Sequence, residues 1–339
     1  MMKRILAFVL VLALVPLCGM ARVYTDSAGR PVELGEKVER VAVTGAMAQM
    51  LVFAIAPDRM VGLATRWDDS AGGLLADKYL ELPLLGQLYG GKGDLNLEQL
   101  LLADPDLVID VGEPKEGIQE DMDDLQARTG IPFVHIDLSA QDMGSPFIEL
   151  GTLLGLEEEG GELAAHCQRV YGLCAGLAAS SERPRAVYLL GDKGLNTLAR
   201  GSYHAGLLDV MFENAAVLPD PSGKGTGDPI DLEMLYRWDP EVILFDPSVY
   251  EEVGELAEWQ PLSAIRAGRY YRAPIGPYNW MGQPPSVQRL MGMLWMGEVL
   301  YPGQEAYDLY EEIAAFFRLF WHCELSRETF GELVGRTAA

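Results

Sequence analysis

The chain has 339 residues, and its 50 Asp and Glu residues outnumber its 26 Lys and Arg residues, so its formal net charge at pH 7 is −24. Such an acidic excess repels nucleic acid and anionic lipid, and it leaves only local patches for an anionic ligand. The length indicates two domains rather than one.

The first 21 residues have the pattern of a secretory signal peptide. A basic pair precedes an apolar run over residues 5–17, and a Gly-Met-Ala sequence places the expected cleavage after Ala21. The run is too short to cross a membrane. Cys18 could instead carry a lipid anchor, but Leu17 before it is larger than the small residue that lipid attachment prefers. We therefore expect a periplasmic or other extracytoplasmic protein that is exported without an anchor.

Residues 157–181 are predicted to form one long helix. Three glutamates crowd its first turn, where the helix dipole favours negative charge, and Pro184 follows its end. About 25 residues at ~1.5 Å each would span roughly 37 Å, close to the width of a small domain. The apolar stripe at helical spacing consists of Leu163, Cys167, Val170, Tyr171, Cys174 and Leu177. The alternative is a surface helix within a single domain.

Short apolar segments alternate with helical segments on both sides of this helix, which indicates an α/β fold with parallel-type sheets. Residues 24–34 read as a hairpin. The expected strands are 40–43, 61–64, 107–110, 133–136, 186–190, 242–245 and 270–272. The expected helices are 46–56, 97–102, 118–129, one capped at Ser145 and stopped at Gly155, 205–214, 232–237, 252–259, 286–300, 305–320 and 327–335.

An internal repeat relates the two halves. Residues 96–110 read NLEQLLLADPDLVID, and residues 231–245, which lie 135 positions later, read DLEMLYRWDPEVILF. The identical pairs are Leu97/Leu232, Glu98/Glu233, Leu100/Leu235, Asp104/Asp239 and Pro105/Pro240. Each copy predicts a capped helix, a turn at Asp-Pro and a buried strand. The alternative is a chance likeness between common α/β units.

These features predict two similar α/β lobes, joined by one long helix, with a ligand cleft between the lobes. The expected division is a signal peptide over 1–21, an N-terminal lobe over 22–155, a connecting helix over 156–181, and a C-terminal lobe with C-terminal helices over 182–339.

The chain resembles the helical-backbone (class III) periplasmic solute-binding proteins, which serve ABC importers of iron-siderophores, haem and cobalamin. The resemblance covers residues 24–335 and rests on the order and spacing of several segments rather than on one motif. These are 25–32 followed by 39–41; 96–98 with 104–109; 191–214 followed by 231–243; and Trp280, 284–287, Arg289, Leu290, Gly292, Trp295 and 300–302.

The resemblance implies a monomeric receptor, with no cofactor, that delivers a small-molecule metal complex to an ABC importer. An iron-siderophore-type chelate is the favoured ligand; molybdate or tungstate, a corrinoid, haem and a nickel chelate stay open. Glu98 and Glu233 match the family's two lobe-surface glutamates, which dock into basic pockets on the permease dimer. One acid on each lobe suits two symmetric subunits. The alternative for each is an ordinary glutamate at a helix start.

Loops at the carboxyl ends of strands line the cleft in such lobes. This placement selects 45–47, Arg66, Trp67, Tyr89, 110–113, Arg200, Tyr203, His204, Tyr278 and Trp280. Aromatic rings with an occasional arginine suit a large anionic chelate. Each of these side chains could equally be ordinary packing or rim.

Direct metal binding by the protein is not expected. Of the four histidines, only His204 is placed in the expected cleft, and no pair stands at metal-ligand spacing on one element. A chelate or an oxyanion is therefore favoured over a bare ion. Cys167 and Cys174 are ~10 Å apart along one helix and cannot bridge each other. Buried free thiols are expected, and a disulfide from either to Cys323 is the alternative.

An exported two-lobe hydrolase is the rival from another class. The sequence has no Walker A loop, H-E-x-x-H or G-x-S-x-G motif, and its glycine-rich segments at 90–93 and 223–227 lack the full phosphate-loop pattern. Such an enzyme would need converging carboxylates such as Asp110, Glu113 and Asp246. We therefore predict a binding protein rather than an enzyme.

Overall fold

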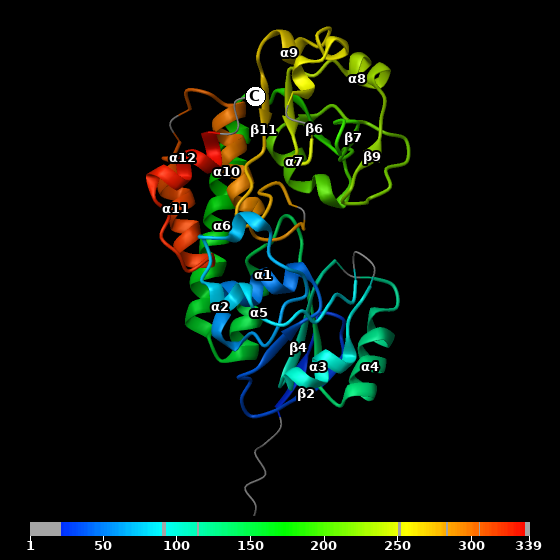
Figure 1. The fold of residues 1–339 in the computed structure, drawn as a ribbon, viewed down its shortest axis with the longest axis vertical. Coiled ribbons are helices and arrows are strands. Elements are labelled where there is room, and N and C mark those ends of the chain that lie inside the picture. The colour runs from blue at the N-terminus through cyan, green and yellow to red at the C-terminus, as the bar shows by residue number, and fades with distance from the viewer. Residues whose placement is uncertain are drawn as a thin grey trace, which may run out of the picture.

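The computed structural model describes residues 22–89, 93–113, 115–249, 252–282, 284–304 and 306–335. The expected signal peptide, with Cys18, lies outside the described residues, as do residues 90–92 of the first glycine-rich segment. Two α/β lobes lie one above the other and are joined by the long helix α6 (Glu157–Ser180), as Figure 1 shows. The predicted fold class is confirmed.

The first lobe is built on a three-stranded parallel sheet. Its order is β3 (Val41–Val43), β4 (Leu107–Gly112), β5 (Phe133–Asp137). All six residues of the central strand β4 are buried, as expected for a parallel sheet that is covered on both faces. The predicted hairpin is β1 (Arg22–Thr25) and β2 (Pro31–Leu34). The helices are α1 (Ala46–Ile55), α2 (Asp77–Leu80), α3 (Leu97–Ala103), α4 (Ile118–Thr129) and α5 (Ser145–Leu154).

Two predictions in this lobe are corrected. Residues 61–64 do not form a strand, because only the isolated bridge from Leu63 to Leu84 pairs this segment with its neighbour. Ser145 is the first residue of α5 rather than its cap. The Asp142 carboxylate instead accepts hydrogen bonds from the backbone N–H groups of Gly144 (3.2 Å) and Ser145 (3.0 Å).

The second lobe has a mixed sheet of order β11-β10-β6-β7-β9, with β8 paired to β6. Its strands are β6 (Arg185–Leu190), β7 (Asn196–Thr197), β8 (Glu213–Asn214), β9 (Asp228–Pro229), β10 (Val242–Phe245) and β11 (Tyr270–Arg272). The strands β6, β8, β10 and β11 pair in parallel, whereas β7 pairs antiparallel with β6 and β9. The helices are α7 (Gly206–Met211), α8 (Leu232–Trp238), α9 (Ser263–Arg266) and α10 (Arg289–Leu300).

Two helices predicted in this lobe are also corrected. The helix expected over 205–214 ends at Met211, because the chain leaves it to form β8 beside β6. The helix expected over 252–259 is two short 3₁₀ turns, Val253–Glu255 and Ala257–Trp259.

The connecting helix α6 begins at Glu157 although two glycines follow in its first turns. Gly160 is explained by a close approach, because a Cβ there would lie 2.4 Å from the Phe147 carbonyl oxygen in α5. Cys167 and Cys174 are buried and free, as predicted, and Cys323 is also free. One apolar core runs from the first lobe through α6 into the second. The connection is therefore a packed helix rather than a loose linker.

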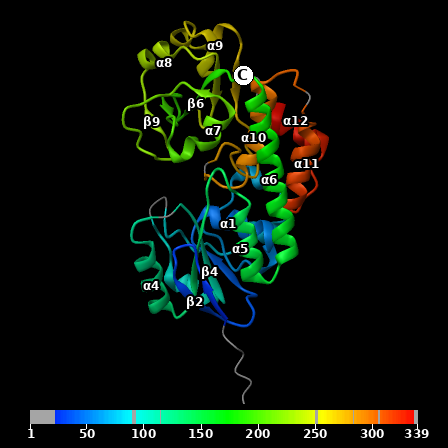
Figure 2. The ribbon, with the colours of Figure 1, turned by 180° about the vertical axis from the view of Figure 1, so that it is seen from behind.

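The C-terminal helices are α11 (Leu309–Phe320) and α12 (Arg327–Gly335). Figure 2 shows α11 alongside α6. Phe320 packs edge-on against Phe147 of the first lobe, with ring centroids 5.6 Å apart, and Trp321 packs against Trp67 at 6.1 Å. The chain thus crosses back onto the first lobe after completing the second. The expected division of the chain into domains stays a prediction.

The two copies of the repeat have the same local structure. Helices α3 and α8 each have seven residues. The N-cap side chain accepts a backbone hydrogen bond in both, from Gln99 to Asn96 (3.0 Å) and from Met234 to Asp231 (2.7 Å). Each helix ends at an aspartate in the left-handed conformation, Asp104 (φ 47°) or Asp239 (φ 37°). The shared caps and helix ends support a true internal repeat.

Candidate ligand cleft

A cleft of about 670 Å³ lies between the lobes. The first lobe contributes Gly45, Ala46, Met47, Gln87, Tyr89, Asp110, Val111, Glu113 and Lys115. The second contributes Tyr203, His204, Lys224, Gly225, Thr226, Gly282, Pro284 and Pro285. The first wall is built at the carboxyl ends of β3 and β4, where parallel α/β sheets place their ligand sites. The volume is within the usual range for small-molecule sites.

A hydrogen-bond chain that runs from buried Asp110 and His135 to half-exposed Asp137 supports the first wall. The Asp110 carboxylate accepts a hydrogen bond from the Thr44 hydroxyl and contacts His135 Nδ1 at 2.8 Å. His135 Nε2 lies 3.1 Å from Asp137. Burial disfavours a charged imidazole, but the hydrogen bonds and charges of the two aspartates outweigh it and raise the pKa of His135. Asp110 is thus held in a fixed orientation at the cleft.

Tyr89 and Lys115 form the outer part of the same wall. The Tyr89 hydroxyl donates to Asp121 (2.6 Å), and the Lys115 ammonium lies 4.1 Å from the centre of the Tyr89 ring. Burial, together with the hydrogen bond to Asp121, raises the pKa of Tyr89. The ring is therefore a neutral surface with a cation stacked against it.

Tyr203 and His204 form the centre of the second wall. Their rings are nearly perpendicular, at 89°, with centroids 5.3 Å apart. The Tyr203 hydroxyl donates across the cleft to the Leu138 carbonyl at 3.2 Å. Burial, and next the charge of Arg289, lower the pKa of His204, so its imidazole is neutral at neutral pH. A Cβ at Gly225 would lie 3.0 Å from the His204 ring, so this glycine allows the loop to cover the ring.

Arg289 is a buried cation directly behind this wall. Its side chain donates to the His204 carbonyl (2.7 Å), and a Cβ at Gly282 would lie 2.6 Å from its Cδ. Only 3% of the residue is exposed, and within the described part of the chain it has no ion-pair partner. Burial lowers its pKa to about 10, so it stays charged at neutral pH. Together with Lys224 it makes the second wall positive.

The structure brings part of the predicted site together and separates the rest. Tyr89, Tyr203 and His204 line the cleft with residues 45–47 and with Asp110, Val111 and Glu113. Trp67 (8% exposed), Tyr278 (6%) and Trp280 (0%) are instead buried in the core and lie outside the cleft lining.

The two predicted arginines also lie outside the cleft lining. Arg200 donates to the Asn214 carbonyl (2.6 Å) and lies 3.5 Å from Glu213, which holds it against β8. Arg66 is exposed but is not among the lining residues. Sequence reasoning missed Lys115, Lys224 and Arg289. Lys224 stands in the glycine-rich segment 223–227, and that composition was the one available signal.

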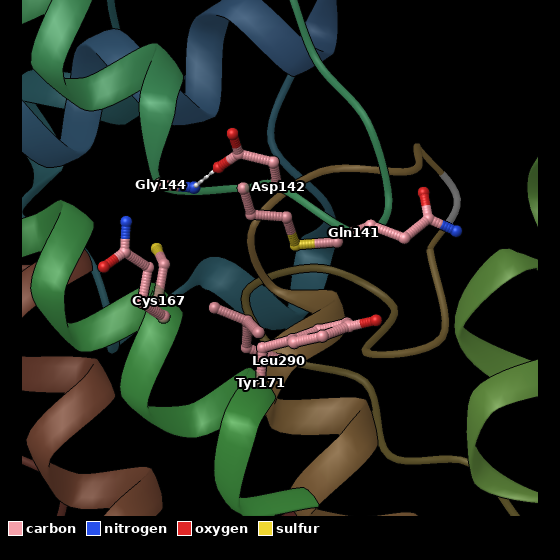
Figure 3. A pocket seen from close by; sticks show the side chains of 8 residues that line it. Gln141, Asp142, Gly144, Cys167, Tyr171 and Leu290 are labelled. Atoms are coloured by element: carbon pink, nitrogen blue, oxygen red, sulfur yellow. Dashed lines mark hydrogen bonds between the residues drawn. The ribbon is translucent and has the colours of Figure 1, made fainter. Parts of the chain in front are cut away.

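Two further cavities are less suitable as the ligand site. One of about 110 Å³ lies beside α6, and Figure 3 shows Cys167 and Tyr171 facing Gln141, Gly144 and Leu290 there; it has room for a few water molecules only. The other, of about 560 Å³, is lined largely by Gly, Pro and aliphatic residues near α12 and has no aromatic ring in its lining. The described residues hold no group of three or more His, Cys, Asp or Glu side chains that could bind a metal ion.

The repeat glutamates lie away from the cleft. Glu98 and Glu233 are both exposed in the first turns of α3 and α8. These two helices lie on different lobes, on the side of the molecule away from α11 (Figure 1).

Two α/β lobes, a packed helical connection and a cleft lined from both lobes define a substrate-binding protein. Residues 41–275 match the periplasmic binding protein family, and the chain belongs to that family. No curated protein sequence matches the chain.

Solved structures of similar proteins agree. An ABC transporter solute-binding protein from Sulfurospirillum deleyianum is 27% identical, with a TM-score of 0.83 over 93% of this chain and 99% of that one. A periplasmic solute-binding protein from Veillonella parvula is 22% identical (TM-score 0.75; 93% and 97% covered). The molybdate-bound periplasmic binding protein MolA of Haemophilus influenzae is 19% identical (TM-score 0.71; 90% and 99% covered). The latter two show a shared fold.

Family membership makes this chain an extracytoplasmic binding protein that works with an ABC transporter, not an enzyme. The carboxylates that the hydrolase alternative required also do not converge. Asp246 is buried and accepts a hydrogen bond from Asn279 (2.6 Å), whereas Asp110 and Glu113 line the cleft. Among the described helices, none is long and apolar enough to cross a membrane.

Proposed function

We propose that the protein captures an anionic metal chelate of the iron-siderophore type in this cleft and delivers it to the permease dimer of an ABC importer. The observation that carries the proposal is local charge. In a chain of net charge −24, the cleft is lined by Lys115 and Lys224 and backed by Arg289. Asp110 and Glu113 also line the first wall, so the positive charge is concentrated on the second wall, which has no carboxylate among its described lining residues and favours an anion there.

The walls also suit a chelate with flat organic groups. Tyr89, Tyr203 and His204 offer ring surfaces, and the cleft volume of about 670 Å³ exceeds what a tetrahedral oxyanion fills. Molybdate is the second candidate, because the similarly folded MolA binds it. A corrinoid, haem and a nickel chelate stay open as further ligands of the same cleft.

Delivery is assigned to Glu98 and Glu233, one on each lobe, which would enter two basic pockets of the permease dimer. Their exposed positions in matching helices support this assignment. The protein would act as a monomer, after export directed by residues 1–21.

Native mass spectrometry of protein purified from its own host tests the proposal. We expect a retained, metal-containing small molecule of net negative charge. Lys224→Gln should reduce its occupancy, whereas Lys193→Gln, which removes an exposed lysine of the same lobe outside the cleft lining, should not. A retained cation or neutral sugar would overturn the anionic chelate, and molybdate alone would establish the second candidate.

A further inference from the structure

The two repeat helices expose apolar side chains beside their glutamates. Leu101 in α3 (49% exposed) and Tyr236 in α8 (39%) occupy equivalent positions of the repeat, three residues after Glu98 and Glu233. Residues three apart lie on the same face of a helix. Each lobe therefore presents a carboxylate next to an apolar side chain. In a complex, the carboxylate could enter a pocket of the partner while the apolar side chain contacts the rim of that pocket.

The next position of the repeat breaks the symmetry. Leu102 in α3 is 71% exposed, and its equivalent in α8 is Arg237. The Arg237 guanidinium lies 2.7 Å from the Glu233 carboxylate, with both side chains largely exposed. Glu98 has no ion-pair partner in the part of the chain that the structure describes.

From this difference we infer that the two docking helices are unequal and that α3 is the dominant contact with the importer. The inference rests on the proposed function of the two glutamates. At α3, a basic pocket would attract Glu98, and no cation paired with it among the described residues would oppose that attraction. At α8, the same pocket would attract Glu233 but would be repelled by Arg237 beside it. Like charge brought into a contact disfavours binding.

A partner with twofold symmetry offers the same pocket twice, so unequal contacts would set the order in which the two helices engage and are released. The pocket that engages first would receive α3, and α8 would occupy the second pocket with less binding energy. The exposed side chain of Tyr236 is also restrained, because its hydroxyl donates to the Glu258 carbonyl. Release after delivery would then begin at α8.

Two reciprocal substitutions test the inference on the full-length mature protein. Leu102→Arg places in α3 the pair that α8 already has, and Arg237→Leu gives α8 the character of α3. Affinity is measured by surface plasmon resonance against the cognate permease–ATPase complex in lipid nanodiscs. We expect Leu102→Arg to weaken binding by about fivefold or more and Arg237→Leu to strengthen it.

Stability serves as the control, because both positions are exposed and the thermal midpoint should be unchanged. Two further variants, Glu98→Gln and Glu233→Gln, test the docking role of the glutamates separately from the inequality of the two helices. If both glutamine variants weaken docking equally and the reciprocal variants have no effect, the inequality is wrong while the docking assignment stands. If neither glutamine variant changes docking, the proposed role of the glutamates is wrong, and the inference falls with it.

Discussion

The Tyr203 hydroxyl of the second lobe donates a hydrogen bond to the Leu138 carbonyl of the first lobe, with the two oxygens 3.2 Å apart. The lobes also meet a few residues further along each chain segment, because a Cβ at Gly206 would lie 2.9 Å from the Ala140 side chain. Since Tyr203 lines the cleft, one side chain both faces the ligand site and joins the two walls. A ligand that contacts Tyr203 would therefore contact a side chain that joins the two lobes.

Removing this bond should weaken ligand capture. Tyr203→Phe keeps the ring but loses one hydrogen bond of about 0.5–1.5 kcal/mol, so we expect affinity to fall about two- to tenfold. Titration calorimetry with the ligand that native mass spectrometry identifies would measure the change. Tyr310→Phe is the matched control, because its hydroxyl donates to the Leu325 carbonyl (2.9 Å) away from the cleft. Equal affinities for both variants and the parent protein would separate Tyr203 from closure.

Trp280 should contribute to stability rather than to ligand contact. It is fully buried, and its Nε1–H donates to the Gly276 carbonyl at 2.9 Å. Trp280→Ala is expected to lower the free energy of unfolding by about 3–5 kcal/mol, since it leaves a large cavity. Urea unfolding followed by circular dichroism measures this. Tyr203→Ala should cost far less, and a comparable loss in both variants would contradict the distinction.

The contrast between Trp280 and Tyr203 shows what the sequence alone could not predict. Alternating apolar segments and the repeat were sufficient to predict the lobes, the connecting helix and most element bounds, because periodicity reports which face is buried. Trp280 stands in a turn and Tyr203 begins a 3₁₀ helix of three residues, and both segments are too short for a period to show which side chain turns inward. Tyr203 lines the cleft, and Trp280 enters the core.

Contacts between residues far apart in the sequence were the second feature that could not be predicted. Arg289 lies in a helical, largely apolar run, and nothing local indicates that it backs the cleft wall. The return of α11 to the first lobe is likewise decided by partners such as Phe147, which lies far away in the sequence. An amphipathic helix predicts that it will be covered, but not by what.

His135 should make the stability of the fold depend on pH. Its folded-state pKa is raised, so the stabilisation from its proton is fully present below the unfolded value of about 6.5 and is lost as pH rises through the folded pKa. We expect the free energy of unfolding to fall above about pH 6.5, and His135→Gln to remove that slope. Urea titrations across this range measure it.

His166 is the matched control for this experiment. Burial lowers its pKa to about 4, so the folded state disfavours its proton, and stability is lost as pH falls below about 6.5. His166→Phe should therefore alter the slope on the acid side and leave the alkaline side unchanged. The opposite pattern would show that the Asp110–His135–Asp137 chain does not hold an extra proton.

Arg289 should contribute to the positive charge of the second wall and, after burial, to the lowered pKa of His204. Arg289→Met keeps the apolar stem but removes the cation, so the pKa of His204 should rise toward its ordinary value, while its burial still holds it below. NMR titration of the imidazole, assigned with His204→Gln, measures this shift. Affinity for an anionic chelate should fall in the same variant. If the pKa of His204 is the same in Arg289→Met and in the parent protein, the charge of Arg289 does not affect His204.

The repeat supplies the most direct test of delivery. Glu98 and Glu233 occupy equivalent exposed positions on two lobes, so exchanging both for Lys sets like charge against two basic pockets. We expect docking to lose about 2–5 kcal/mol, because a reversed charge in a desolvated contact is both unpaired and repelled. Uptake into vesicles that carry the cognate importer should fall accordingly.

Ligand affinity and thermal stability should stay unchanged in this double variant, since both side chains lie on the surface and outside the cleft lining. Glu120→Lys with Glu255→Lys is the matched control, because these exposed glutamates stand one on each lobe, outside the repeat, and change the net charge equally. If the control pair reduces uptake as much as the repeat pair, long-range charge governs the encounter. Normal uptake by the repeat pair would leave Glu98 and Glu233 as helix-start residues stabilised by the dipole, without a role in docking.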